Sequence, residues 1–415
     1  MVDPETPKSV VIIGGGQAGL QTASSLRRLG YSGAITLICD ELELPYQRPP
    51  LSKAFLLENL SGVDLHFCPL EFFERERIDL IRGDRATALN RRARTMQLQS
   101  GFSIPYDHVI FATGSRSRTL NIPGADLSGV FNLRTLEDAR RLRARLPEAR
   151  RVVVIGGGFI GLEFAAVATK LGLDVTLLEA GSRLLARSVT QPTAQLFEET
   201  HRSWGVKLEF GSVAVALHGK NGTISAIETS DSRLLPADIV LIGIGIQPNA
   251  EIAAAAGLAV DDGICVDNYL LTEDANISAI GDCARFMSIG GNAFRLESVQ
   301  NALDQARAVA SRLSGKPHPY SAVPWFWSDQ RDLKLQIAGL TQDYDEIVVR
   351  GDAQAHQYAA FCFNQKKLNA VEAVNRPSDF MAVRRILEQG ITVSPEQISD
   401  PAFDLRALVG GGRRG

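Results

Sequence analysis

The fold is decided by residues 10–19, which read VVIIGGGQAG. A β-branched apolar run leads into the pattern Gly14-x-Gly16-x-x-Gly19, and residues 20–30 carry apolar side chains at a spacing suited to a helix. Strand, glycine turn and helix in this order form a dinucleotide-binding fingerprint. Gly14 allows the tight turn, Gly16 lets backbone N–H groups reach a pyrophosphate, and Gly19 lets the helix pack closely on the strand. We therefore expect the N-terminus of this helix to bind phosphate groups.

The same pattern recurs in the middle of the chain at residues 151–161, which read RVVVIGGGFIG. A strand again precedes Gly156-x-Gly158-x-x-Gly161, and a helical run follows over residues 162–171. Two complete units predict that the chain binds two dinucleotides. The alternative for either copy is a close-packed turn that binds no ligand.

An acidic residue follows the second strand of each unit. In the second unit the strand over residues 174–178 ends on Glu179, at the spacing of about 20 residues expected for an acid that hydrogen-bonds a ribose 2′-hydroxyl. In the first unit residues 34–39 form the equivalent strand, and Asp40 is better placed than Glu41 for this role. Both units thus contain the strand, the helix and the acid that dinucleotide binding requires.

The composition is that of an ordinary globular protein with two or three domains. Of the 415 residues 45% are hydrophobic and 22% are charged, and the formal net charge of -3 gives no reason to expect binding to nucleic acid or to a membrane surface. No apolar run approaches the ~18 residues of a membrane-spanning helix. The polar residues 1–9 do not resemble a signal peptide. We expect a cytoplasmic protein.

The cysteines and histidines predict neither a redox disulfide nor a metal site. The five cysteines are Cys39, Cys68, Cys265, Cys283 and Cys362. None forms a C-x-x-C or C-x4-C pair, so we expect no relay of electrons through a disulfide. The scattered cysteines and the six histidines also predict no metal binding. His108 precedes an apolar run, and we expect it to be structural.

Three further segments could bring polar groups to a cofactor. Residues 45–53 form a stiff proline-rich loop that could lay Arg48 and Lys53 along a cofactor, although a solvated surface loop is the alternative. Residues 106–115 read as a strand that runs into a glycine turn, where small residues allow close approach. A short apolar strand delivers Asp282, whose carboxylate could accept hydrogen bonds from a polyol or cap the next helix.

The last quarter of the chain predicts a separate module. A long helix is expected over residues 297–313, with an N-terminus that could point at an electron-rich ring edge. Residues 333–374 then alternate like antiparallel strands, and residues 378–390 resemble a helix, so we expect an α+β module. Trp325 and Trp327 either pack in its core or cover the flat face of a flavin.

Local signals also predict turns and helix starts. Thr135 and Asp138 stand at the spacing of a capping box. Asn221-Gly222 is a strong hairpin signal, and residues 364–367 resemble a second hairpin turn.

Taken together, these segments resemble the FAD-dependent ferredoxin reductases of oxygenase systems, of the putidaredoxin-reductase type. The resemblance covers nearly the whole chain and includes both glycine fingerprints. Its other motifs are RPPLSK at residues 48–53, ATG at 112–114, RTLED at 134–138, GDCARF at 281–286, ESV at 297–299 and WFWSDQ at 325–330.

The resemblance implies that the first unit binds FAD and the second binds NADH. By this resemblance Lys53 lies near the reactive nitrogen of the flavin and pairs with Glu163. Trp327 lies beside the flavin, and Phe159 gates the nicotinamide pocket. The implied FAD contacts are Gly14, Gly16, Ala18, Gly19, Asp40, Arg48, Lys53, Ala86 through its backbone, Thr113, Gly114, Arg134, Asp282 and Val299. The implied NAD contacts are Gly156, Gly158, Phe159, Ile160, Gly161, Glu163, Glu179 and Gly245.

The fold class that follows is α/β, with two nested Rossmann-like domains and a C-terminal α+β domain. We expect the chain to divide as residues 1–115 for the first FAD segment, 116–244 for the NAD domain, 245–320 for the second FAD segment, 321–405 for the C-terminal domain and 406–415 for a flexible tail.

The activity implied by the resemblance is NADH-dependent ferredoxin reduction. FAD accepts a hydride from NADH and passes single electrons to a small acidic [2Fe-2S] ferredoxin, which feeds a monooxygenase or dioxygenase. Docking should be transient, electrostatic and salt-sensitive, with Arg285 and Arg307 as candidate contacts. One alternative is an NADH oxidase or peroxidase that uses Cys39 as a single redox cysteine. Another is a redox-sensing flavoprotein of the apoptosis-inducing-factor kind.

The choice of nicotinamide nucleotide follows from the acid of the second unit. Glu179 should bind a 2′-hydroxyl and repel a 2′-phosphate, so we expect NADH to be preferred over NADPH. Arg183 and Arg187 lie nearby in the sequence and leave the strictness of this preference open.

Overall fold

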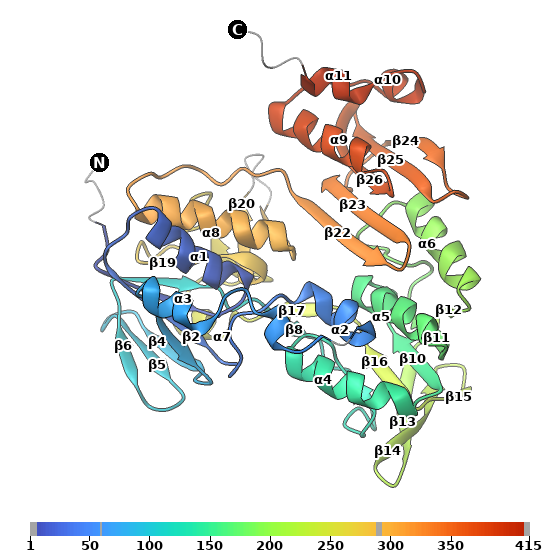
Figure 1. Cartoon of the computed structure of the whole chain (residues 1–415), viewed down its shortest axis with the longest axis horizontal. Helices are drawn as coiled ribbons and strands as arrows, with labels where there is room; N and C mark the ends of the chain where they lie inside the picture. The colour runs from blue at the N-terminus through green and yellow to red at the C-terminus, as the bar shows by residue number, and fades with distance from the viewer. Residues whose placement is uncertain (1–5, 59, 288–292, 411–415) are drawn as a thin grey trace. The chain divides into compact units, whose positions relative to one another are not determined.

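The fold consists of two compact units, each assembled from separate stretches of chain (Figure 1). The computed structural model describes residues 6–58, 60–287 and 293–410. Unit 1 falls within residues 1–47, 62–116 and 246–322, and unit 2 within residues 48–61, 117–245 and 323–415. Both units combine helices with sheets, so the predicted α/β class is confirmed.

Unit 1 is organised around a parallel sheet with the strand order β19-β7-β1-β2-β3. Strand β1 pairs with β2 and β7, so that Val11 lies opposite Thr36 on one side and Val109 on the other. The residues of β1 from Val10 to Ile13 are at most 4% exposed, as expected for a continuous apolar run in a parallel sheet. The strands are β1 (Ser9–Ile13), β2 (Ala34–Cys39), β3 (Asp79–Arg82), β7 (His108–Phe111) and β19 (Ile277–Ala279).

Helices α1 and α8 of unit 1 pack side by side (Figure 1). The helix predicted over residues 297–313 is observed as α8, which begins at Val299, two residues later than predicted, because the Ser298 hydroxyl caps it by accepting a hydrogen bond from the N–H of Asn301. The helices are α1 (Gln17–Arg28), α3 (Leu70–Arg75), α7 (Glu251–Ala255) and α8 (Val299–Leu313). The smaller sheets are β4 (Ala86–Asn90) with β5 (Thr95–Leu98) and β6 (Ser103–Pro105), β18 (Ile264–Val266) with β20 (Ala284–Met287) and β21 (Ala293–Phe294), and β8 (Ser115–Ser117) with β17 (Ile246–Pro248).

Unit 2 repeats the parallel sheet in the order β12-β11-β10-β16-β9. Val153 of β10 lies opposite Thr176 and Val240, the same arrangement as in unit 1. The strands are β9 (Val130–Phe131), β10 (Arg151–Ile155), β11 (Asp174–Glu179), β12 (Lys207–Phe210) and β16 (Ile239–Ile242). The helices of this part are α2 (Ala54–Leu57), α4 (Leu136–Arg145), α5 (Phe159–Lys170) and α6 (Gln191–Ser203).

Both local predictions for this part of unit 2 are confirmed. Thr135 and Asp138 form a reciprocal capping box at the start of α4. Asn221 and Gly222 have φ angles of 54° and 76°, as a tight turn of type I′ requires, and they join β13 to β14. This antiparallel sheet contains β13 (Ala214–Lys220), β14 (Thr223–Thr229) and β15 (Leu234–Pro236).

The C-terminal part of unit 2 is an antiparallel sheet in the order β22-β23-β26-β25-β24 with three helices. Gln365 and Lys366 have positive φ angles and form the predicted hairpin turn between β25 and β26. The strands are β22 (Trp325–Gln330), β23 (Leu333–Gly339), β24 (Glu346–Asp352), β25 (Gln357–Asn364) and β26 (Lys367–Val374). The helices are α9 (Pro377–Gln389), α10 (Pro395–Ser399) and α11 (Leu405–Gly410).

The two units group the chain differently from the predicted division, most broadly because residues 117–245 and 323–415 fall in the same unit. Residues 48–61 belong to unit 2 rather than to the unit of the first glycine turn. Residues 405–410 are helical, because Leu405, Leu408 and Val409 pack on the C-terminal core, so α11 occupies the first part of the predicted tail. Residues 411–415 of that tail lie outside the described residues.

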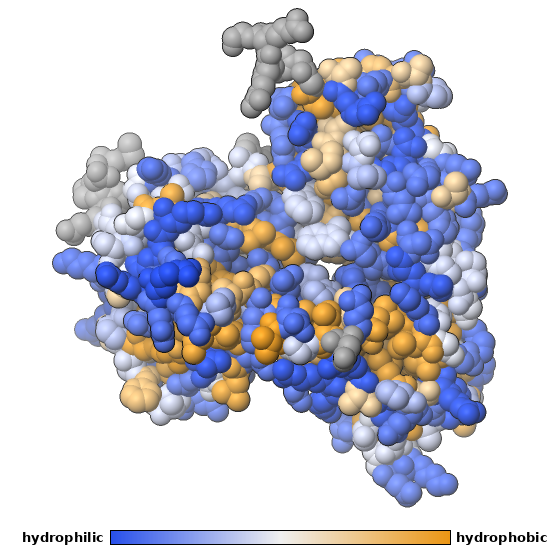
Figure 2. All heavy atoms as spheres, in the orientation of Figure 1, coloured by the Kyte–Doolittle hydropathy of each residue, from blue (hydrophilic) through white to orange (hydrophobic). Residues whose placement is uncertain are grey.

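The surface is predominantly hydrophilic on the face drawn in Figure 2, where the apolar residues gather in several patches. Within the described part of the chain, none of the helices combines the length and the apolarity needed to cross a membrane.

His108 should make the stability of the fold depend on pH. It is 3% exposed, its Nε2 lies 2.9 Å from Ser278 Oγ, and burial together with the charge of Arg312 lowers its pKa to about 3. The unfolded pKa is about 6.5, so between about pH 3 and 6.5 the unfolded chain binds more protons and stability falls as the pH falls. The loss at about pH 5 should be about 2 kcal/mol.

The measurement is the melting temperature of the wild type and His108→Gln between about pH 7 and pH 5. The variant should lose part of the pH dependence, while His318→Gln, at an exposed position, should retain it. The same pH dependence in all three proteins would contradict the assignment.

Candidate functional site

The first glycine turn connects β1 to α1 and is shaped by close backbone contacts. Gly14 has a φ of 111°, and a Cβ there would collide with the carbonyl oxygen of Ala112. A Cβ at Gly19 would collide with the carbonyl oxygen of Gly14. At Gly16, in contrast, a Cβ would meet no described atom within 4 Å. The turn is therefore packed on the sheet at Gly14 and Gly19 and leaves a cradle at Gly16.

The N-terminus of α1 opens into this cradle. Gly16 is the N-cap residue, and among the described residues no side chain caps the helix and no acid stands in its first turn. The first N–H groups of the helix thus stay available to an anion, which the helix dipole also favours. This arrangement fits the pyrophosphate of a dinucleotide.

Several predicted FAD contacts of unit 1 lie around the same turn. A Cβ built on Gly281 would lie 3.3 Å from the Cβ of Ala18, so the segment that carries Asp282 lies against the start of α1. The carboxylate of Asp282 accepts a hydrogen bond of 2.8 Å from Ser115, next to Gly114. Thr113 is held by Asn249, to whose carbonyl oxygen its hydroxyl donates at 2.6 Å.

The other predicted FAD contacts have varied surroundings. Val299 is the first residue of α8, and Asp40 is exposed directly after β2. Ala86 is 3% exposed in β4, where it pairs with Leu98. Arg48 and Arg134 lie together in unit 2, where Nη1 of Arg48 donates to the carbonyl oxygen of Arg134 at 2.8 Å.

The second glycine turn, between β10 and α5, has the same construction. Gly156 has a φ of 107°, and a Cβ at Gly161 would collide with the carbonyl oxygen of Gly156. A Cβ at Gly158 would come no closer than 4.0 Å to a described atom. Among the described residues no side chain caps α5, and Ile160 in its first turn is 41% exposed. This turn therefore offers a second cradle for a phosphate group.

Glu179 is fixed beside this second turn. Its Oε2 accepts a hydrogen bond of 2.7 Å from the N–H of Gly157, and its Oε1 accepts one of 2.7 Å from the N–H of Gly181. The carboxylate thus stands at the end of β11 next to the glycine turn, where an acid that binds a ribose is expected.

The two arginines near Glu179 have different surroundings. The guanidinium of Arg183 donates to the carbonyl oxygens of Val189 at 2.9 Å and Ala186 at 2.8 Å, so it stabilises its own loop. A Cβ built on Gly245 would lie 3.3 Å from Nη2 of Arg187, so the guanidinium group of Arg187 lies near this glycine.

Lys53 and Glu163 form an ion pair in unit 2, in which the carboxylate is buried and the lysine is partly exposed. Nζ of Lys53 lies 2.8 Å from Oε1 of Glu163, and Glu163 is 3% exposed. The same carboxylate accepts hydrogen bonds from Ser52 at 2.5 Å and from Ser328 at 2.7 Å. Three donors therefore replace the water that the carboxylate loses on burial.

The packing of α5 on β22 explains why these groups meet. Phe159 and Glu163 are four residues apart and share one face of α5, while Phe326 and Ser328 alternate onto one face of β22. The rings of Phe159 and Phe326 lie 4.5 Å apart, and Ser328 then reaches Glu163. Trp327 points to the other face of the strand, with its ring 5.6 Å from that of Trp325.

Ser52 and Ser328 carry no assigned role in the sequence prediction, although both lie within quoted motifs. No spacing rule relates a serine of the proline-rich loop to one on a strand 276 residues later in the printed sequence. Only the structure therefore shows that both serines donate hydrogen bonds to Glu163.

The thiols of Cys39, Cys68 and Cys283 in unit 1 do not have the features of a redox centre. Cys39 is 5% exposed beneath the first glycine turn, and burial, with the charges of Asp40 and Glu41, raises its pKa to about 12. Burial also raises the pKa of Cys68 to about 11 and that of Cys283. A thiol that stays protonated at neutral pH is a poor nucleophile. Over residues 6–58, 60–287 and 293–410, no group of three or more potential ligands is suited to a metal.

Cys39→Ser should therefore keep the reaction of the protein with its electron donor. The reduction of the predicted FAD by the predicted NADH should stay within about twofold of wild type, because a protonated thiol takes no part in the transfer. Anaerobic stopped-flow absorbance measures this rate. A loss of peroxide or oxygen reduction in this variant alone would instead support a cysteine-dependent oxidase.

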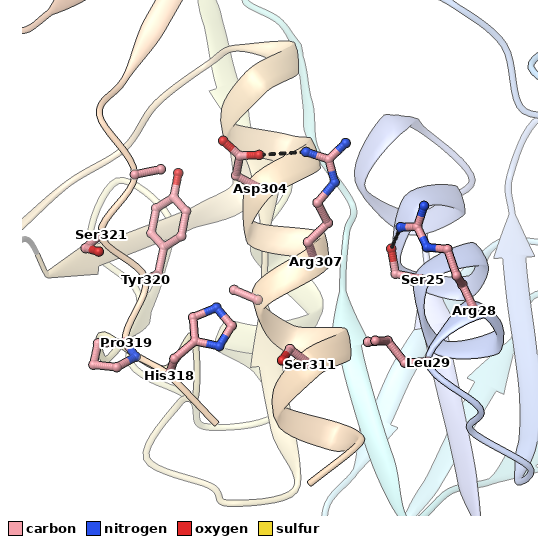
Figure 3. Close-up of a pocket in the computed structure, with 12 residues that line it drawn as sticks. Ser25, Arg28, Leu29, Asp304, Arg307, Ser311, His318, Pro319, Tyr320 and Ser321 are labelled. Carbon is pink, nitrogen blue, oxygen red and sulfur yellow. Dashed lines mark hydrogen bonds and ion pairs between the residues drawn. The ribbon is translucent and has the colours of Figure 1, made fainter. Parts of the chain in front are cut away.

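A shallow groove of about 470 Å³ lies elsewhere on unit 1. Figure 3 shows Arg28 at the end of α1 facing Arg307 of α8, with His318 on the following loop. The groove is at the C-terminal end of α1, whereas the glycine turn is at the N-terminal end. It is therefore separate from the dinucleotide cradle.

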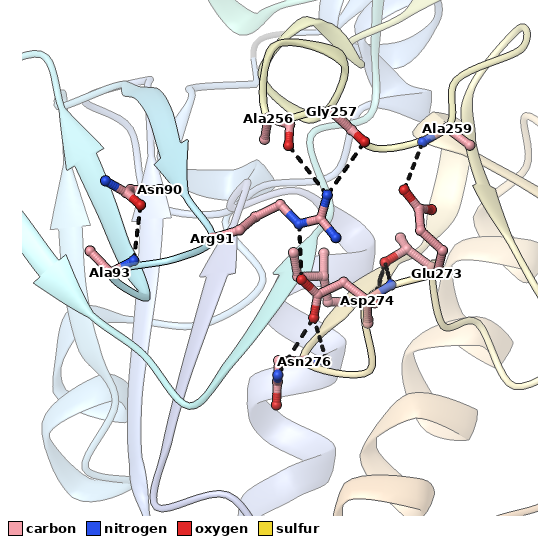
Figure 4. A network of polar contacts seen from close by, with 11 residues as sticks. Asn90, Arg91, Ala93, Ala256, Gly257, Ala259, Glu273, Asp274 and Asn276 are labelled. Atoms are coloured by element: carbon pink, nitrogen blue, oxygen red, sulfur yellow. Dashed lines mark hydrogen bonds and ion pairs between the residues drawn. The ribbon is translucent and has the colours of Figure 1, made fainter.

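A polar network of unit 1 is structural (Figure 4). Nε of Arg91 lies 2.9 Å from the carboxylate of Asp274, which also accepts the N–H of Asn276 at 3.0 Å. The arginine joins the loop after β4 to the segment before β19.

Comparisons with known proteins agree with this geometry. Residues 8–306 match the family described as pyridine nucleotide-disulphide oxidoreductase, and residues 325–409 match the one described as reductase C-terminal. Rhodocoxin reductase of Rhodococcus erythropolis is 46% identical, covering 97% of this chain and 94% of its own length.

Two solved structures are similar to the whole chain. The ferredoxin reductase for the CYP199A2 system from Rhodopseudomonas palustris has a TM-score of 0.95 and 47% identity, covering 97% of this chain and 99% of its own. The covalent putidaredoxin reductase–putidaredoxin complex has a TM-score of 0.94 and 38% identity, with 98% and 99% covered.

Proposed function

Because the chain belongs to the pyridine nucleotide-disulphide oxidoreductase family, we propose that it is an FAD-dependent NADH:ferredoxin oxidoreductase. The observation that carries the proposal is the pair of open glycine turns in a chain whose buried thiols have raised pKa values. Two dinucleotide cradles in a chain without a closely spaced cysteine pair suit a path in which electrons leave the flavin directly for a protein acceptor. The similarity to reductases of small redox proteins supports a [2Fe-2S] ferredoxin as this acceptor.

The residues of the first turn fit FAD. The open cradle at Gly16 and the uncapped start of α1 suit a pyrophosphate. Bound FAD supplies the acceptor of a hydride and the donor of single electrons. The carboxylate of Asp282 and the turn at Thr113 and Gly114 supply polar groups around it.

Lys53 and Glu163 are the side chains that we assign to the flavin environment. Lys53 carries a positive charge that favours negative charge on a nearby ring. Glu163 holds that ammonium group in place at 2.8 Å. Phe159, which packs on Phe326, and Trp327, on the opposite face of β22, are each proposed as an apolar contact of the bound cofactors, and neither acts as a nucleophile.

The second turn suits NADH rather than NADPH. Glu179 presents a carboxylate where a 2′-phosphate would have to lie, and like charges repel. Arg183, which could have attracted that phosphate, donates instead to two backbone carbonyl oxygens of its own loop.

Glu179→Ala should weaken the preference for NADH. We expect the ratio of kcat/KM for NADH over NADPH to fall by roughly tenfold, because a repulsion of about 1.4 kcal/mol is removed. Glu179→Gln separates charge from shape, and Glu198→Ala is the control, because the partly exposed carboxylate of Glu198 pairs with Arg202 of its own helix α6. An unchanged ratio in both Glu179 variants would rule out the assignment.

Stopped-flow absorbance tests the function as a whole. Rapid bleaching of the flavin by NADH, followed by rapid reduction of added [2Fe-2S] ferredoxin, is the expected result. The second step should slow with added salt, because docking of an acidic partner on a surface that includes the half-exposed Arg307 is electrostatic.

Other outcomes would point to other functions. Rapid bleaching with transfer only to oxygen or peroxide would indicate an oxidase, and slow bleaching with a long-lived NAD complex would indicate a sensor. A protein with no flavin absorbance after incubation with FAD would contradict the assignment of the first turn.

A further inference from the structure

A chain of hydrogen bonds leads from Glu163 into the interior of unit 2. Ser328 Oγ donates to Oε1 of Glu163 at 2.7 Å, and Nε2 of Gln330 donates to Ser328 Oγ at 3.1 Å. The Oε1 of Gln330 lies 2.7 Å from Nε2 of His201. The chain thus connects a carboxylate on α5 with an imidazole in the last turns of α6, by way of β22.

Each member of this chain is removed from solvent. His201 and Ser328 are 0% exposed, Gln330 is 1% exposed and Glu163 is 3% exposed. Ser328 and Gln330 are two residues apart and lie on the same face of β22. With water excluded, each group depends on its protein neighbour for a hydrogen bond.

The hydrogen bonds between His201 and Glu163 all run in one donor-to-acceptor direction, and His201 determines that direction. Nδ1 of His201 has no partner among the described residues, whereas Nε2 faces an amide oxygen. Burial and the charge of Arg331 lower the pKa of His201 to about 4, so near neutral pH the ring carries a single N–H. Because only Nε2 has an acceptor within hydrogen-bond distance among the described residues, we assign this proton to Nε2. The amide oxygen of Gln330 accepts this N–H, so the NH₂ group of Gln330 faces Ser328. Ser328 accepts from that group and has one hydrogen to give, which goes to Glu163.

We infer that His201 is a positioning residue for the Lys53–Glu163 pair: by fixing the orientation of Gln330 and Ser328, it keeps a hydrogen-bond donor aimed at the carboxylate that holds Lys53. The inference rests on the proposed function, because it assigns a purpose to a pair that we place beside the flavin. If the chain were reversed, Ser328 would donate to Gln330, and Glu163 would lose one of its three donors. The ammonium group of Lys53 would then be held less firmly.

The first test is the tautomer of His201 in the wild-type holoenzyme. Long-range ¹H–¹⁵N correlation spectra of ¹⁵N-histidine-labelled protein distinguish a proton on Nε2 from one on Nδ1, and the signal that is absent from His201→Phe identifies the residue. We expect a neutral ring protonated at Nε2. A ring protonated at Nδ1, or on both nitrogens near neutral pH, would overturn the inference. This test needs neither turnover nor a ferredoxin.

The second test uses substitutions within the hydrogen-bond chain. His201→Phe removes the donor, and the rate of flavin reduction at saturating NADH should fall by about tenfold, the effect of one hydrogen bond to a charged group. The Kd for NADH should stay within about twofold of wild type, because the variant leaves both the second glycine turn and the carboxylate of Glu163 in place. The midpoint potential of the flavin should become more negative, because a less fixed Lys53 stabilises the reduced form less.

A conservative variant and a matched control separate positioning from general stability. His201→Gln restores an N–H donor and should recover part of the rate and of the potential. The control is His356→Gln, because His356 also contacts α6, at 3.3 Å from Thr200 Oγ1, but takes no part in the chain to Glu163. Should His201→Phe fail to fold, Gln330→Met breaks the same chain one step closer to Glu163.

The outcomes that refute the positioning role differ from those that refute the proposed function. A wild-type rate and potential in His201→Phe, or equal losses in His201→Phe, His201→Gln and His356→Gln, would refute the positioning role. Failure of the proposed function would look different, because the wild type would then transfer no electrons to ferredoxin while the tautomer and the variant effects on flavin reduction stayed as predicted.

Discussion

The ion pair of Glu163 and Lys53 imposes a condition on the whole of unit 2. Moving a carboxylate out of water costs several kcal/mol unless an opposite charge and hydrogen bonds replace its hydration. Glu163 obtains these from the proline-rich loop, through Ser52 and Lys53, and from the C-terminal sheet, through Ser328. Removal of one partner would leave a buried charge uncompensated, at a cost of about 3–5 kcal/mol. The three segments must therefore pack together for the unit to be stable.

A second buried carboxylate links the C-terminal sheet to the start of α6. Glu372 on β26 is 0% exposed and accepts hydrogen bonds from the N–H of Thr190 at 2.8 Å and from its hydroxyl at 2.7 Å, at the N-terminus of α6. Burial raises the pKa of this carboxyl group. Apolar faces alone tolerate small shifts of a sheet against a helix, but directional bonds to two buried acids do not. The C-terminal sheet is thereby held in one register against α5 and α6.

The sequence predicts the parts of this protein that are encoded locally. Both glycine turns, the acids that follow their second strands and the hairpin at Asn221 were all recognisable, because strand, turn and helix lie within a few tens of residues. The ion pair was expected only from the resemblance to known reductases. The contributions of Ser52, Gln330 and His201 were not predictable, since they depend on the meeting of a loop, a strand and a helix that are far apart in the sequence.

The two glycine turns show how one scaffold acquires different chemistry. Glu163 stands seven residues after Gly156, and the residue seven after Gly14 is Gln21. The amide of Gln21 donates a hydrogen bond of 2.8 Å to Ser25 of its own helix, so this bond involves no distant segment. The carboxylate at the equivalent place in α5 requires a cation and two hydroxyl groups, and it obtains them from outside its helix. The turns and sheets can therefore remain alike while a single ionisable side chain determines which further segments assemble around the second unit.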